Sequence, residues 1–333
     1  MSVDKILGDW KKMKFKPVYW LEGEEEYYID QLVNYAEHNI LTEAEAGFNL
    51  TVFYGKDADW TAVINACRRY PMFAERQVVL LKEAQQMRDI DKLEGYIEKP
   101  LTSTIFVVSY KEKKVDGRSK LAKLLKDKAE LFTTKKMYDN QLPDWTNSLI
   151  QSKGYTISQK ALLLLVEHIG NDLTRIDNEI NKLLVNLTGR NAITEDDIER
   201  YVGVSKEYNV FELQDAFAKK DRVKAIRIIQ YFEGNPKAGP IQLILPSLYN
   251  FFSKAYMIFG QPARDDKSVA AAIGVNPFFV KDYLTAVRNY NYEGIENGIL
   301  LLHAYNLKSI GVNSTGTEDG SLLKELVVKI MGG

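Results

Sequence analysis

The chain has 333 residues, of which 45% are hydrophobic and 27% charged, a composition typical of a globular protein with two or three domains. Its 44 basic residues nearly cancel its 45 acidic ones, so the charge balance does not indicate wholesale binding to DNA. A single cysteine excludes an intrachain disulfide, and no apolar run has the length of a membrane helix or signal peptide core, so we expect a cytoplasmic protein without membrane contact.

Residues 1–141 alternate between strand-like and helix-like segments. Strands are predicted where short apolar or β-branched runs end at turn or charged residues, at 17–23, 49–55, 76–81, 104–110 and 130–137. Helices are predicted between them, at 25–40, 59–70, 90–99 and 118–128. Because parallel strands need crossover connections, this alternation predicts an α/β domain with a mainly parallel sheet covered by helices on both faces.

After residue 141 the strand signals stop, and a small helical domain is predicted at 142–207. Pro143 suits the first turn of a helix, and Ser158 suits the position before one. Thr194 and Asp197 have the spacing of a capping box before a last short helix. A domain this small has marginal stability alone, so we expect it to pack on a neighbour.

A second all-helical domain is predicted at 208–333. Its helices are unusually apolar and aromatic, at 241–259, 278–290 and 295–310. A helix that is apolar around most of its circumference is buried on several sides, within a large bundle or against another subunit. Oligomer contacts are therefore expected here.

The turn after the first predicted strand is where a parallel α/β domain commonly binds phosphate. It reads WLEGEEEYYID at 20–30, with the single glycine Gly23 followed by Glu24, Glu25 and Glu26. A phosphate loop needs successive glycines and then a lysine and a hydroxyl residue, and three glutamates would repel a triphosphate. The sequence predicts a nucleotide-type scaffold with a degenerate site and no cofactor. No metal site is expected, because the three histidines lie far apart without ligand partners.

Isolated charged residues in this domain are more commonly surface residues than residues of a binding or catalytic site. Lys111 begins a basic stretch that could contact phosphate, but a solvated surface is more usual. Glu83 follows the third predicted strand, where an NTPase often has an acidic residue, yet alone it is more often a surface glutamate than a base.

The stretch RRYPMFAERQVVLL at 68–81 gathers large apolar side chains where a helix should end. Pro71 disfavours helical geometry at Tyr70, so Tyr70, Met72 and Phe73 should follow the helix end directly. Judged from residue type alone, the commoner outcome is that Met72 and Phe73 fold back over the sheet. The functional alternative is a protein-binding anchor, for which Met and Phe are well suited.

Five motifs, in this order along the chain, resemble the delta subunit of the bacterial DNA polymerase III clamp loader. They are PVYWLEGEE at 17–25, CRRYPMFAERQVVLL at 67–81, NVFELQDA at 209–216, LPSLYNFF at 245–252 and NPFFVKDYL at 276–284. Each motif alone is weak, but their order makes the match fairly specific, and it spans essentially the whole chain.

The resemblance implies three domains: an AAA+-like module with a degenerate P-loop and no ATPase activity at 1–141, a helical lid at 142–207 and a helical collar at 208–333. In this family the apolar turn inserts into a pocket of the ring-shaped sliding clamp and favours the open ring. Carried over, the inserting residues are Tyr70, Met72 and Phe73. Leucine is more usual than methionine at the second position, and Pro71 stands where a small polar residue is common.

The implied function is in DNA replication. The chain would bind the sliding clamp (beta ring) and join the gamma/tau and delta prime subunits in a hetero-oligomer that loads the clamp on primed DNA. It would have neither ATPase nor polymerase chemistry of its own, although the complex it serves is a DNA polymerase. Two alternatives stay open: a catalytically inactive AAA+-like adaptor outside replication, and an active NTPase.

Overall fold

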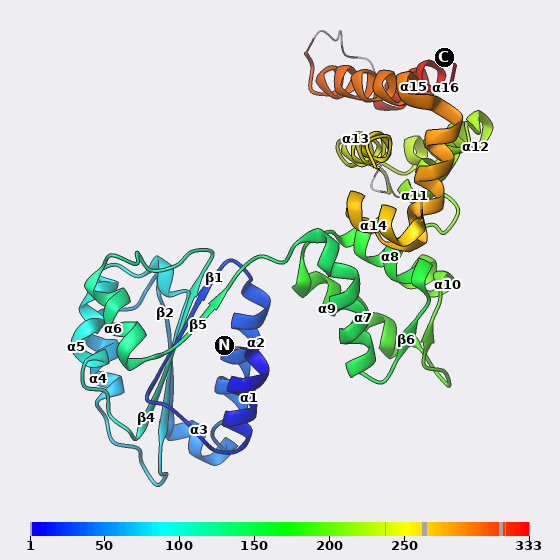
Figure 1. The fold of residues 1–333 in the computed structure, drawn as a ribbon. Helices are drawn as coiled ribbons and strands as arrows, with labels where there is room; N and C mark the ends of the chain where they lie inside the picture. The colour runs from blue at the N-terminus through cyan, green and yellow to red at the C-terminus, as the bar shows by residue number, and fades with distance from the viewer. Residues whose placement is uncertain (1, 237, 262–264, 313–315, 317, 333) are drawn as a thin grey trace. The chain divides into compact units, whose positions relative to one another are not determined.

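The computed structural model describes residues 2–236, 238–261, 265–312, 316 and 318–332. The chain divides into two compact units, Met1–Met137 and Tyr138–Gly333 (Figure 1). The lid and the collar expected from the sequence both fall in the second unit, and their division into separate domains stays a prediction.

A five-stranded parallel sheet forms the centre of the first unit, in the order β2-β3-β4-β1-β5. The strands are β1 Val18–Gly23, β2 Leu50–Tyr54, β3 Gln77–Lys82, β4 Thr104–Lys111 and β5 Glu130–Thr134. All five predicted strands and their parallel direction are confirmed. The last strand is shorter than predicted and ends at Thr134.

Helices cover both faces of this sheet, as predicted (Figure 1). Successive strand residues point to opposite faces, so Trp20 belongs to one core and Leu21 to the other. The core around Trp20 is covered by α4 Trp60–Cys67, α5 Glu94–Ile97 and α6 Lys120–Lys128. The core around Leu21 is covered by α1 Val3–Lys11, α2 Glu26–Asn39 and α3 Glu43–Asn49.

Four short segments of this unit differ from the expected pattern. α1 and α3 were not predicted as helices. The expected helix at 90–99 is a 3₁₀ turn, Ile90–Leu93, followed by the short α5. Another 3₁₀ turn, Ala84–Gln86, follows β3.

The second unit is mainly helical, and its predicted capping residues are confirmed. Ser158 accepts a hydrogen bond from the Ala161 amide at 3.2 Å, and Thr194 and Asp197 form the capping box. The lid-region elements are Asp139–Gln141 (3₁₀), α7 Leu142–Ser152, α8 Gln159–Ile169, α9 Leu173–Asn186, α10 Glu195–Asp197 and the π-helical turn Ile198–Val202.

The expectation that strands end after residue 141 is wrong in one place. β6 Thr156–Ile157 pairs in parallel with β7 Ala192–Ile193. The Thr156 amide donates to the Asn191 carbonyl at 2.8 Å, and the Ser158 amide donates to the Ile193 carbonyl at 3.0 Å. Two residues are too few to give a periodic sequence signal, so this pairing depends on the helices that bring the segments together.

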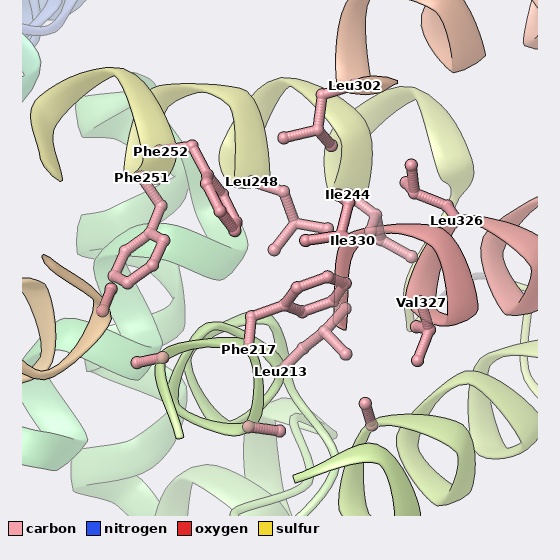
Figure 2. Close-up of a cluster of buried hydrophobic side chains, with 14 of the residues drawn as sticks. Leu213, Phe217, Ile244, Leu248, Phe251, Phe252, Leu302, Leu326, Val327 and Ile330 are labelled. Carbon is pink, nitrogen blue, oxygen red and sulfur yellow. The ribbon is translucent and has the colours of Figure 1, made fainter. Parts of the chain in front are cut away.

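The remaining helices enclose one large apolar core (Figure 2). Phe252 of one long helix packs against Gly298 of another, where a Cβ would lie 2.8 Å from the Phe252 ring. The helices are α11 Val210–Ala218, α12 Arg222–Gly234, α13 Ile241–Ile258, α14 Asp266–Ile273, α15 Val280–Ser309 and α16 Asp319–Gly332, with a 3₁₀ turn at Pro277–Phe279 before α15.

The two helices expected at 278–290 and 295–310 are the two halves of α15. They meet at Asn291, whose backbone leaves the helical region with φ of 54°. The Asn291 side chain accepts a hydrogen bond from the Gly294 amide at 3.0 Å, as a helix N-cap does. Among the described residues, no helix has both the length and the apolar character that a membrane crossing needs.

Candidate functional site

The apolar turn lies between the end of α4 and the start of β3, at the amino edge of the parallel sheet. The exposed fractions of Tyr70, Met72 and Phe73 are 78%, 54% and 95%. The expectation that Met72 and Phe73 fold back over the sheet is therefore wrong. The predicted end of the helix just before Tyr70 is confirmed, since the C-cap residue is Arg68.

A buried glutamine fixes the base of this turn. The Gln77 side-chain amide donates to the Arg69 carbonyl at 2.7 Å and to the Ala66 carbonyl at 3.1 Å. It also donates to the Thr104 hydroxyl at 2.8 Å, which in turn donates to the Cys67 carbonyl at 2.8 Å. Carbonyls at the end of α4 and just beyond it are thus bonded by the first residue of β3 and by β4.

A second buried amide, Asn49, contacts the middle of the turn. Its Oδ1 accepts a hydrogen bond from the Met72 amide at 2.7 Å, and its Nδ2 donates to the Met72 carbonyl at 2.9 Å. Phe73, the next residue, has φ of 54°, in the left-handed region that a bulky side chain rarely adopts. The exposed apolar side chains therefore lie on backbone that buried polar groups hold in place.

The degenerate phosphate turn lies at the opposite, carboxyl edge of the sheet. Gly23 ends β1 opposite Thr134 of β5. Its φ is +127°, and a Cβ at this position would lie 2.2 Å from the Thr134 carbonyl oxygen. The Glu25 amide donates to the Thr134 hydroxyl at 3.1 Å. Backbone that could face a phosphate is thus packed against the end of β5.

The three glutamates of the turn have different positions. Glu25 is buried and is the N-cap of α2, accepting a hydrogen bond from the Tyr27 amide at 3.4 Å. Glu26 lies in the first helical turn, where a negative charge interacts favourably with the helix dipole. Glu24 is exposed and accepts a hydrogen bond from the Lys136 amide at 3.5 Å.

Lys111, at the end of β4, is surrounded by carboxylates, and its side chain is only 12% exposed. Its Nζ lies 2.8 Å from Asp30 Oδ1, 3.0 Å from Glu83 Oε1 and 3.5 Å from Glu26 Oε2. Burial alone lowers the pKa of Lys111, but hydrogen bonds and charges from Asp30 and Glu83 outweigh it and raise the pKa above its ordinary value. The solvated-surface interpretation is wrong for Lys111, whereas Glu83 is a partly exposed glutamate that pairs with it.

Sequence reasoning missed Asn49 and Gln77, which bond the backbone of the apolar turn, and the Lys111 cluster. Asn49 is 23 residues away from Met72, and Lys111 is 81 residues away from Asp30. No local periodicity or motif marks such distant pairs. The available clue was that Lys111 and Glu83 both follow predicted parallel strands, whose carboxyl ends meet at one edge.

Comparisons with known proteins agree on one family. Residues 19–135 match the family model described as DNA polymerase III, delta subunit. The DNA polymerase III subunit delta of Bacillus subtilis (strain 168) is 27% identical over 337 residues, with 96% of this chain and 95% of the relative covered. The solved Bacillus subtilis DNA clamp loader delta protein (YqeN) is 26% identical, with full coverage of both chains and a TM-score of 0.55.

The chain is similar to DNA polymerase III delta subunits over nearly its whole length, and residues 19–135 match their family model. A probable DNA polymerase III subunit delta of Aquifex aeolicus (strain VF5) is also similar, with 22% identity over 86% of this chain and 83% of the relative. The resemblance inferred from the sequence motifs is confirmed, as is an α/β domain with a parallel sheet followed by a helical region. The family is one of clamp-loader components and not of polymerases.

Proposed function

We propose that this chain binds the sliding clamp, the beta ring, through Tyr70, Met72 and Phe73, and favours its open form. The observation that carries the proposal is that these large apolar side chains are exposed on a turn held by hydrogen bonds from the buried side chains of Asn49 and Gln77. Large apolar side chains gathered on the surface commonly mark a protein-binding site. Met and Phe in such a position can enter an apolar pocket as anchors.

Clamp opening then follows from differential binding. A turn that binds the open ring more tightly than the closed ring shifts the equilibrium between them by the ratio of the two affinities. No hydrolysis at this chain is needed for that shift. ATP on partner subunits would decide when the turn can reach the clamp.

We also propose that the chain itself has no ATPase activity. Two contacts support this: Gly23 is packed against Thr134, and Lys111 is already neutralised by Asp30 and Glu83. A phosphate would have to compete with these carboxylates for the lysine and would meet further negative charge at Glu24. Contacts within the protein therefore occupy the edge of the sheet at which an NTPase binds its nucleotide.

The partners proposed for the second unit are the other clamp-loader subunits, gamma/tau and delta prime. Several apolar residues of its long helices are exposed, among them Leu243 and Met257 of α13 and Leu300 of α15. Such positions are suited to contacts between subunits. In the assembled complex the chain would act on primed DNA.

The test is binding to the sliding clamp of the same source by surface plasmon resonance, for wild type and for Met72→Ala/Phe73→Ala. Burying these side chains contributes about 1.5–3 kcal/mol each, so the double variant should bind at least about a hundredfold more weakly. Tyr54→Ala is the matched control, because Tyr54 is an exposed aromatic at the opposite edge of the same sheet.

Three outcomes separate the candidate functions. Equal binding by wild type and the double variant would place the contact elsewhere on the chain. No binding by folded wild type would favour an adaptor outside replication. Saturable binding in an ATP titration of the isolated chain would contradict the inactive site and favour an NTPase.

A further inference from the structure

The apolar turn has an unusual backbone for a surface that must be ready to bind. Phe73 has φ of 54° and is 95% exposed, so the packing of its own side chain cannot hold this conformation. A bulky residue persists in the left-handed region only where surrounding structure imposes it. The neighbouring residue Met72 is the point at which such structure makes contact.

We propose that Asn49 is a positioning residue that preforms the turn for its partner. The inference rests on the proposed clamp-binding function and names the residue on which the geometry of that site depends. Asn49 is the last residue of α3 and is only 2% exposed. Its side-chain amide is hydrogen-bonded to the backbone of Met72, so Asn49 acts on binding without touching the clamp.

The hydrogen bonds of Asn49 use the whole side-chain amide. Oδ1 accepts from the Met72 amide at 2.7 Å, while Nδ2 donates to the Met72 carbonyl at 2.9 Å and to the Glu45 carbonyl at 3.0 Å. The pair of bonds to Met72 imitates the exchange between two residues of neighbouring β-strands. Because the third bond anchors the amide to α3, the position of Met72 follows that helix.

Gln77 does not replace this contact. Its hydrogen bonds reach the Ala66 and Arg69 carbonyls and Thr104, all before the turn or outside it. Without Asn49, the segment between Arg69 and Gln77 would still be held at its two ends, but the hydrogen bonds to Met72 in its middle would be lost. A turn that spends less time in the binding conformation has a proportionally weaker apparent affinity.

The experiment compares wild type with Asn49→Ala in clamp binding by surface plasmon resonance. The loss of two hydrogen bonds, each contributing about a two- to fivefold factor, predicts binding about five- to twenty-fivefold weaker. The same substitution made in the Met72→Ala/Phe73→Ala background should leave the residual affinity unchanged. That non-additivity is the readout that a general loss of stability would not produce.

Asn209→Ala provides a matched control in the second unit. Asn209 is also a buried amide, and it donates to the Ser205 carbonyl at 2.9 Å and accepts from the Glu212 amide at 3.0 Å. It should destabilise its own unit without weakening clamp binding. Equal binding by Asn49→Ala and wild type, or an equal loss in both asparagine variants, would overturn the proposal.

Amide hydrogen exchange of the wild-type chain tests the positioning separately from the clamp. The Met72 amide should exchange slowly although the turn is exposed, and it should exchange at least about tenfold faster in Asn49→Ala. Rapid exchange of Met72 in wild type would overturn the proposal even if Asn49→Ala failed to fold. Protection of Met72 together with no clamp binding by wild type would overturn the proposed function and, with it, the role of Asn49 in clamp binding.

Discussion

Gly23→Ala tests whether the degenerate phosphate turn is closed by the sheet itself. The φ of +127° makes any L side chain unfavourable, at about 1–2 kcal/mol. The added Cβ would also lie 2.2 Å from the Thr134 carbonyl oxygen and 2.5 Å from its hydroxyl. Relieving this contact requires the ends of β1 and β5 to separate, and such overpacking costs about 1–3 kcal/mol. The separation would also disturb the hydrogen bond from the Glu25 amide to the Thr134 hydroxyl. The first unit should lose about 3–5 kcal/mol of unfolding free energy.

Native-state hydrogen exchange measured by mass spectrometry suits this prediction, because it reports the opening of β1 and β5 separately from the second unit. Gly154→Ala is the control: Gly154 also has positive φ, of +83°, but nothing lies within 4 Å of its Cβ position. Gly154→Ala should lower the unfolding free energy of its own unit by about 1–2 kcal/mol, which is the effect of the positive φ alone. A loss in Gly23→Ala no larger than that in Gly154→Ala would refute the argument that Thr134 occupies the turn.

Three further predictions concern single side chains. Lys111→Met should lower the unfolding free energy of the first unit by about 1–2 kcal/mol, measured by urea denaturation, since partly exposed carboxylates such as Glu83 lose their cation. The pKa of Asp197 is lowered by Arg190, so their pairing should stabilise the chain above about pH 4 and be lost as the pH falls through the folded pKa. Asp197→Asn should remove that acid dependence from hydrogen exchange in α10, and an unchanged acid profile would contradict the pairing. Burial raises the pKa of the Cys67 thiol, so a thiol reagent should label the chain only after unfolding.

Much of the architecture was predictable because its signals are local. The five strands of the first unit carry apolar runs bounded by turn residues, and all five were found in parallel order. Helix starts at Ser158 and Thr194 were readable because a capping side chain bonds an amide three residues away. The helices α1 and α3 were not predicted. Their apolar residues pack in the core on one face of the sheet, a contact that the local sequence does not show.

The candidate site also has features that the sequence predicted and features that it could not predict. The sequence indicated the degenerate turn at Gly23, Glu24, Glu25 and Glu26, since the glycines and lysine of a phosphate loop are missing there. It also located the apolar turn by the proline beside Tyr70. It could not show whether Met72 and Phe73 are buried, because identical residues can cover a sheet or face solvent.

By itself, therefore, the sequence determined the five strands of the first unit, the absence of a phosphate loop and the position of an apolar turn. Only the tertiary structure decided that the turn is exposed, that Asn49 holds Met72, and that carboxylates surround Lys111. The physical reason is range. Propensity, capping and turn chemistry act over a few neighbouring residues, whereas burial and hydrogen bonding at these sites join side chains from elements far apart in the chain.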